Sequence, residues 1–168
     1  MDTILPKTLL QETLDYYEVK KNYENVVSKS LPILFFGDLN QYFDSNLKIV
    51  TVGKNPSGWE FENKLGEKFN RFPKYRKTPY SLELSLCEYF KTDPYRNWFN
   101  HYDKYLNHFG YSFYDKSNFK RVIHTDICSP LSTNPVWSKL DKKITDELFK
   151  DGFEIWKNLP QFKDFMCK

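Results

Sequence analysis

The stretch "IVTVGKNPSGWEF", residues 49–61, changes abruptly from β-branched residues to turn formers. The run Leu47–Val52 (LKIVTV) lies between Asn46 and Gly53, a pattern typical of a short central strand buried on both faces. A Gly, an Asn-Pro pair and a Ser-Gly pair then end the strand. Because ligands of open parallel sheets lie beyond the carboxyl ends of the strands, this stop predicts one wall of a pocket.

A second apolar run stops in the same way. Residues 121–127 (RVIHTDI) read as a strand and are followed directly by Cys128-Ser129-Pro130. The other periodic segments are predicted helices: residues 8–28, 81–90, 94–109 before Gly110, and a helical region that runs from Asn134-Pro135, as N-cap and N1, to Trp156. Strands that alternate with helices indicate an α/β fold, which we expect to be a three-layer α/β/α arrangement with a short central parallel sheet. Both strand-end loops are then candidates to share one pocket.

Length and composition indicate a single domain that spans residues 1–168. With 15 Phe, 12 Tyr and 4 Trp, aromatic residues make up 18% of the chain, so much of the core and of any binding surface must consist of rings. The formal net charge of +3 says little about a polyanionic partner, because the distribution of charge matters more than its sum.

The cysteines and the N-terminal sequence favour a reducing, cytoplasmic setting. Three scattered cysteines form no CxxC pair and no disulfide framework, so neither a metal site nor an iron-sulfur cluster is expected. The N-terminus has no basic segment followed by an apolar one, and no run approaches the ~20 apolar residues of a membrane span. Secretion and membrane insertion are therefore not expected.

Three segments taken together resemble a known family. The pattern VTVGKNPSGWEF, then FNRFP at residues 69–73, then VIHTDICSPLSTNPVW is similar to the first two signature regions of the uracil-DNA glycosylase superfamily, in the divergent branch whose first motif has the form G-x-N-P-S/G. The resemblance covers residues 45–160. It implies a uracil-DNA-glycosylase-like fold, DNA as partner, no cofactor, and hydrolysis of the N-glycosidic bond of a base flipped out of DNA.

The first motif carries the expected catalytic residue. A residue that precedes proline is held extended, so Asn55 would present its amide rigidly to the pocket. By resemblance, Asn55 positions the attacking water; the alternative is that it satisfies backbone groups of the turn. Gly53 and Ser57 would let the backbone and a phosphate approach closely, and Lys54 and Pro56 complete the loop expected to contact DNA.

A basic and aromatic segment follows the first motif. Residues 64–77 (KLGEKFNRFPKYRK) hold six Lys or Arg and one Glu, which suits phosphate contact combined with base stacking, although a solvated basic loop would look the same. By resemblance, Phe69 stacks on the extruded base, with Phe72 as the competing choice and a core position as the alternative for either ring. The expected phosphate contacts are Lys68, Arg71 and Arg76.

The second motif departs from the family pattern at Asp126. Uracil-specific relatives have Asn here, whose amide can both accept from and donate to the uracil edge. An ionised carboxylate only accepts, so Asp126 suits the exocyclic amine of cytosine or a modified cytosine. The alternative is that Asp126 caps the turn at Cys128-Ser129. His124 shares the face of Asp126 on a regular strand, and no catalytic role is assigned to it.

The family pattern also breaks off at the C-terminus. Related domains continue into further strands and a later motif, and nothing after Trp156 supplies them, so we expect a fragment, a natural truncation or a shortened relative. Two other functions remain open. One is a non-catalytic module of the same fold that binds nucleic acid or a protein partner. The other is a hydrolase of small nucleotides that uses the same pocket.

Overall fold

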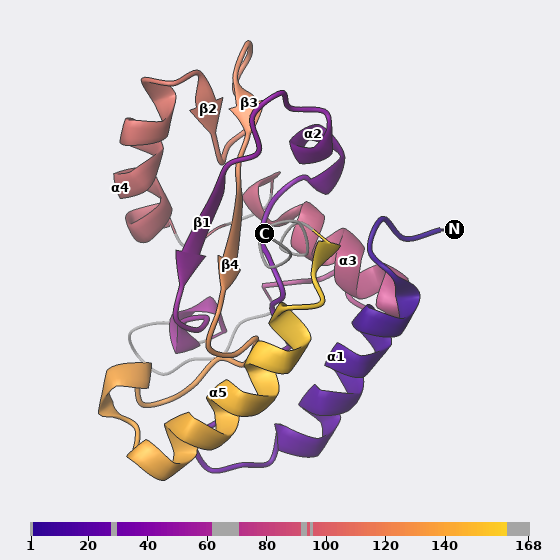
Figure 1. The fold of residues 1–168 in the computed structure, drawn as a ribbon, viewed down its shortest axis with the longest axis vertical. Helices are drawn as coiled ribbons and strands as arrows, with labels where there is room; N and C mark the ends of the chain where they lie inside the picture. The colour runs from indigo at the N-terminus through magenta and orange to yellow at the C-terminus, as the bar shows by residue number, and fades with distance from the viewer. Residues whose placement is uncertain (1, 28–29, 62–70, 92–93, 95, 161–168) are drawn as a thin grey trace.

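The fold is α/β, with short parallel sheets and surrounding helices (Figure 1). The computed structural model describes residues 2–27, 30–61, 71–91, 94 and 96–160. Its elements in chain order are α1 (Lys7–Lys20), α2 (Leu39–Phe43), β1 (Val50–Gly53), η1 (Gly58–Glu60), α3 (Pro79–Cys87), η2 (Tyr89–Lys91), α4 (Arg96–Asn107), β2 (Tyr111–Ser112), β3 (Lys120–Arg121), β4 (Ile123–Asp126), η3 (Trp137–Lys139) and α5 (Lys142–Trp156).

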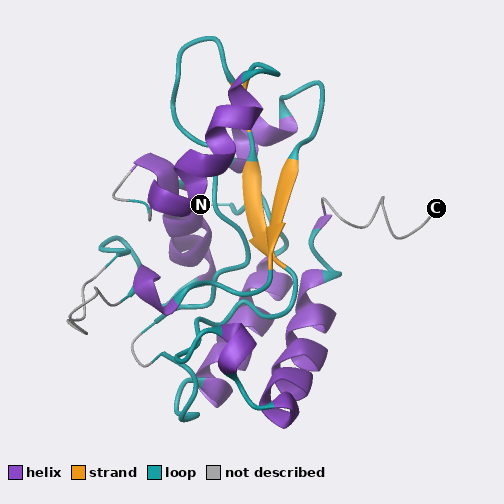
Figure 2. Ribbon diagram, turned by 90° about the vertical axis from the view of Figure 1, so that its left-hand side faces the viewer, coloured by secondary structure: helices purple, strands orange, loops and turns teal. Residues whose placement is uncertain are grey.

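The two predicted strands pair in parallel, as the sequence indicates. β1 lies beside β4 in a register that sets Val50 opposite Ile123 and Gly53 opposite Asp126, and both strands end on the same side (Figure 2). On its other edge β4 meets Phe36, which exchanges two backbone hydrogen bonds of 2.8 and 2.9 Å with His124. β2 and β3 form a second, shorter parallel pair.

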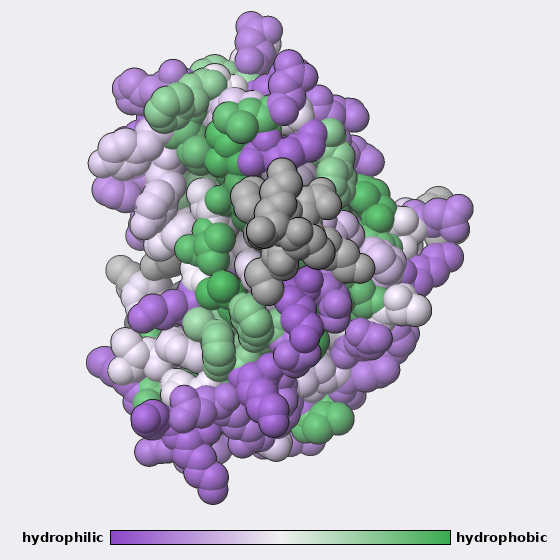
Figure 3. All heavy atoms as spheres, viewed as in Figure 1, coloured by the Kyte–Doolittle hydropathy of each residue, from purple (hydrophilic) through white to green (hydrophobic). Residues whose placement is uncertain are grey.

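The prediction that the first strand is buried on both faces is wrong. Within the described residues β1 pairs only with β4, so it forms an edge of this sheet. Val52 on β1 is 50% exposed, and hydrophobic side chains reach the surface over β1 in the view of Figure 3. No residue of β1 is fully buried, so the β-branched run reflects strand propensity rather than a central position.

Two predicted helix boundaries are also wrong. Residues 21–27 do not continue α1, because Val26 and Val27 leave the helix to pair with the loop of the second motif; Val27 N donates to Ser132 O at 3.0 Å. No helix begins at Asn134-Pro135. There the backbone N of Asn134 donates to Asn25 O at 3.1 Å, and α5 begins only at Lys142, where the side chain of Asp141 accepts from Lys143 N at 2.8 Å.

Rings make up much of the core, as the composition predicts, beside a larger number of buried Leu, Ile and Val side chains. Phe36 stacks on Tyr89 with 3.7 Å between ring centroids, and Phe90, Phe99 and Phe113 continue the cluster through edge and stacked contacts. The buried segment that carries Phe36, residues 31–36, was not predicted as a structural element. No helix among the described residues is long and apolar enough to cross a membrane.

Candidate functional site: a cavity at the ends of β1 and β4

The two strand-end loops meet in one cavity, as expected from the parallel pairing. Residues 53–57 of the first motif form one side, and His124 and Asp126 of β4 form the other. The loops are joined directly, because Ile127 N donates to Gly53 O at 3.1 Å and Cys128 N donates to Lys54 O at 2.8 Å. The cavity holds about 160 Å³. Sites for drug-sized ligands measure about 300–1,000 Å³, so this one suits a single ring system.

Gly53 makes room for the carboxylate of Asp126. A Cβ atom at Gly53 would lie 2.3 Å from Asp126 Oδ1 and 3.2 Å from His124 Nε2, a separation at which the side chains must move. Any larger residue at position 53 would displace the two polar groups of β4 from the cavity. Position 53 therefore requires glycine because the Asp126 side chain approaches its backbone closely. The sequence suggests a second reason, the approach of a phosphate.

Asp126 is a buried carboxylate without a hydrogen-bond donor in the described part of the chain. The residue is 6% exposed, and His124 Nε2 lies 3.6 Å from its Oδ1. The alternative role as a turn cap is wrong. Cys128 N donates to Lys54 O instead, and no hydrogen bond joins Ser129 to the Asp126 carboxylate among the described residues.

His124 is fixed between Thr51 and a tryptophan. Its Nδ1 lies 2.9 Å from Thr51 Oγ1 on β1, and its ring centroid lies 4.6 Å from that of Trp98 on α4. These contacts turn Nε2 towards Asp126. A separation of 3.6 Å is too long for a good hydrogen bond. His124 thus orients the carboxylate rather than saturating it.

Asn55 joins the two loops through its amide nitrogen. Nδ2 donates to Thr133 Oγ1 at 2.9 Å, to Leu131 O at 3.3 Å and to Pro56 O at 3.1 Å. The alternative role of Asn55, in which it bonds backbone groups of the turn, is therefore confirmed. Only the amide nitrogen makes these bonds, and Oδ1 accepts no hydrogen bond from any described residue. The amide is held rigidly and keeps an acceptor atom for a ligand or water.

Helix α5 holds the second loop in place. A Cβ atom at Gly152 would lie 2.6 Å from Cys128 O and 2.7 Å from the Cα of Ser129, so the helix backbone packs directly against the loop. Burial raises the pKa of the Cys128 thiol; the nearby Lys54 acts to lower it and Asp126 to raise it. The thiol therefore stays protonated near neutral pH and is a poor nucleophile.

The other predicted contacts of the first motif differ in exposure. Lys54 is exposed beside the cavity, whereas Pro56 is buried. The Ser57 hydroxyl accepts from Trp59 N at 3.2 Å and caps η1, so its oxygen already has a structural role. Of these residues, Lys54 best retains the predicted role as a phosphate contact.

The basic segment is only partly available to a ligand. Arg71 is buried, and its Nε donates to Glu60 O at 3.0 Å and lies 3.3 Å from Glu60 Oε2, so its predicted phosphate contact is replaced by an internal ion pair. Phe72 packs in the core against Phe61 and is not a base platform. Arg76 is exposed. The predictions for Lys68 and Phe69 fall outside the described residues.

Several residues of the cavity wall were not identified from the sequence. Phe36, Glu60, Trp98 and Phe99 line the cavity beside the two motifs. Glu60 is buried and its carboxylate accepts from Tyr89 OH at 2.9 Å, which makes it part of the internal network with Arg71. Of these residues, only Glu60 could have been found from the sequence, because it lies within the first motif. The three rings come from segments that are distant in sequence.

Comparisons with protein-family models, with curated protein sequences and with solved structures found no match. The chemistry of the cavity is therefore inferred from its own atoms. Asp126 and Asn55 line the cavity together with the rings of Phe36, Trp98 and Phe99, and neither the Asp126 carboxylate nor Asn55 Oδ1 accepts a hydrogen bond from a described residue. Such a site suits a flat ligand that donates hydrogen bonds from its edge. No group of three or more His, Cys, Asp or Glu within the described residues has the geometry to hold a metal ion.

Proposed function

We propose that the protein is a DNA glycosylase-like member of the uracil-DNA glycosylase superfamily, with the three-layer fold of that family, which binds a flipped base and hydrolyses its N-glycosidic bond. The observation that carries the proposal is the meeting of Asn55 and Asp126 in one cavity of about 160 Å³, sized for one ring system. The two residues come from separate motifs and lie at the carboxyl ends of adjacent parallel strands.

Asn55 is the water-positioning residue in this proposal. Its Oδ1 accepts a hydrogen bond from the attacking water, while the contacts of Nδ2 with Thr133 and Leu131 fix the direction of the amide. Hydrolysis transfers the water hydroxyl to the sugar C1′. The base leaves with the electron pair of the broken bond and takes up a proton. Fixing the water in line with that bond lowers the entropic part of the barrier.

Asp126 reads the edge of the base. As an acceptor without a donor among the described residues, it suits an exocyclic amine and opposes the O4 oxygen of uracil. We therefore propose a cytosine-type or modified cytosine base as substrate. His124 positions this carboxylate, and the Trp98 and Phe99 rings wall the cavity beside it. Phe69 remains the proposed stacking ring on the base.

The proposed partner is DNA, held at its phosphates by Lys54 and Arg76, whose side chains are exposed. Lys68 is proposed as a further contact by resemblance. Arg71 is not proposed as a phosphate contact, because its guanidinium forms an ion pair with Glu60 inside the protein.

The test of the proposal is base release by the parent protein and by Asn55→Ala. Oligonucleotides that each carry one uracil, cytosine or modified cytosine are incubated with protein, and abasic sites are detected by strand cleavage in alkali. We expect release by the parent and a loss of about 100-fold or more in Asn55→Ala, the order of effect of a misplaced reactant. The control is Asn158→Ala, which removes an exposed amide just beyond α5 whose Nδ2 donates to Glu154 O.

The outcomes of this assay distinguish the glycosylase from the two alternative functions. Equal rates for the parent and Asn55→Ala would remove Asn55 from the mechanism. Tight binding of one base without any abasic product would replace the glycosylase by a binding module of the same fold. Release from free nucleotides but not from DNA would indicate a small-nucleotide hydrolase.

A further inference from the structure

One face of α4 carries a row of exposed rings that begins at the cavity. Trp98 lines the cavity and contacts Tyr102, with 4.3 Å between ring centroids. Tyr102 contacts His101 at 5.5 Å, and His101 contacts Tyr105 at 5.6 Å. Tyr102 and Tyr105 are 41% and 61% exposed, and Phe109, two residues beyond the end of α4, is 75% exposed. Large rings are seldom left this open without a partner.

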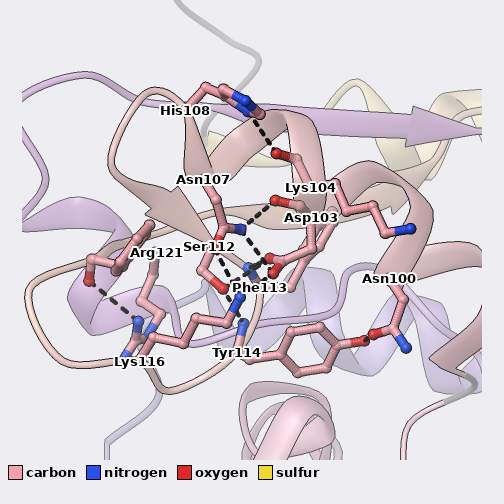
Figure 4. Close-up of polar contacts among 11 residues, drawn as sticks. Asn100, Asp103, Lys104, Asn107, His108, Ser112, Phe113, Tyr114, Lys116 and Arg121 are labelled. Atoms are coloured by element: carbon pink, nitrogen blue, oxygen red, sulfur yellow. Dashed lines mark hydrogen bonds and ion pairs between the residues drawn. The ribbon is translucent and has the colours of Figure 1, made fainter.

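The acidic residue of the α4 segment faces the protein interior and not the exposed rings. The sequence RNWFNHYDKYLNHF, residues 96–109, contains one acidic residue, Asp103. Asp103 is buried against β2, where Oδ1 accepts from Ser112 Oγ at 2.7 Å and Phe113 N at 2.9 Å (Figure 4). Lys104 is exposed. The described rings on this side of α4 therefore have no α4 carboxylate among them, and Lys104 lies on the neighbouring side of the helix, in a hollow that it lines with Asn100 and Asp103.

The anchoring of Asp103 also makes the outer face rigid. Lys116 and Asn107 contact its second oxygen, Oδ2, at 2.5 and 2.8 Å, and Tyr114 OH donates to Asn100 at 2.6 Å (Figure 4). A helix tied to its neighbours in this way presents its outer rings in fixed positions. Stacking then costs less conformational entropy than it would on a mobile segment.

We infer that this face, Trp98, His101, Tyr102, Tyr105 and Phe109, stacks the bases of a single strand of nucleic acid that leads to the cavity. Trp98 and Tyr105 are separated by about 10 Å along the axis at about 1.5 Å per residue, which is room for two or three bases at about 3.4 Å each. Aromatic platforms of neutral to basic character are how proteins bind single strands without sequence preference. The inference rests on the proposed function for its choice of nucleic acid.

The test is the binding of a fluorescent 12-nucleotide oligothymidine, followed by anisotropy. This probe has no cytosine-type base, so its binding does not depend on base recognition in the cavity, and the ring variants separate the α4 face from the phosphate contacts at Lys54 and Arg76. We expect Tyr102→Ala and Tyr105→Ala each to weaken binding about fivefold or more, since stacking contributes about 1–3 kcal/mol per base. Tyr105→Trp should keep the parent affinity. The control is Phe149→Ala, which removes an exposed ring from α5.

Salt and strandedness separate stacking from other causes. Tyr105→Ala should leave the dependence of affinity on salt unchanged, whereas Lys104→Ala should lower its slope by about 0.7. The same sequence as a duplex should bind more weakly, because its bases are already stacked. Unfolding curves of each variant show whether the fold is kept.

Two results would overturn the inference. One is parent-like oligothymidine binding by the Tyr102→Ala/Tyr105→Ala double variant. The other is an absence of binding by the parent, which would point to a protein partner for these rings. The glycosylase proposal is tested separately by base release: ring-dependent oligothymidine binding without base release would keep this inference and remove that function.

Discussion

Asp103 and Asp126 are both buried carboxylates, yet their surroundings differ completely. Asp103 accepts hydrogen bonds from Ser112, Phe113, Asn107 and Lys116 (Figure 4). Asp126 accepts none from the described residues and has only His124 at 3.6 Å. A saturated carboxylate stabilises the fold, whereas a buried charge without donors costs stability and is retained where a ligand supplies them. The difference is what we expect if Asp103 is structural and Asp126 belongs to a binding site.

The largest expected effect is on stability. Asp103→Ala should lower the free energy of unfolding by about 3 kcal/mol, because a buried donor left without an acceptor costs about 1–3 kcal/mol. Asp126→Ala should leave it unchanged or raise it, since no hydrogen bond is lost. Urea unfolding of both variants measures the contrast. A large loss in Asp126→Ala would show that Asp126 is structural too.

A second, smaller effect is expected in how the stability of the parent and of Asp103→Asn depends on pH. Burial acts to raise the pKa of Asp103, but the hydrogen bonds from Lys116, Ser112 and Asn107 outweigh it and hold the pKa below its ordinary value. Stability from this group is thus fully present above about pH 4, the ordinary Asp range, and is lost as pH falls through the lower folded pKa. In Asp103→Asn the acid-induced loss should shrink. An identical pH dependence in both proteins would contradict this assignment.

The smallest expected effect concerns phosphate contact beside the cavity. Lys54→Ala should weaken binding of a DNA duplex and reduce the slope of log affinity against log salt by about 0.9, which corresponds to one phosphate contact. Lys150→Ala on α5, also exposed, is the matched control. If both variants keep the parent slope, DNA does not pass over the first motif.

The sequence predicts the parallel pairing and the shared pocket because both depend on local signals, namely two β-branched runs that each end in turn formers. The sequence does not predict which polar groups around the pocket form hydrogen bonds or ion pairs within the protein. The burial of Arg71 depends on Glu60, and the wall formed by Trp98 depends on the packing of α4. Likewise, residues 21–27 have a helical pattern but pair with the second loop, since tertiary contacts outweigh helix propensity there.

The most direct test of the central claim is the base preference of the parent compared with that of Asp126→Asn. Excision and binding are measured on oligonucleotides that carry uracil, cytosine or a modified cytosine at one position. The parent should prefer the amine-bearing bases, and Asp126→Asn should shift the preference towards uracil by about 5- to 150-fold, the equivalent of about 1–3 kcal/mol for a mismatched buried polar pair. Efficient processing of uracil by the parent, unaffected by the substitution, would contradict the account.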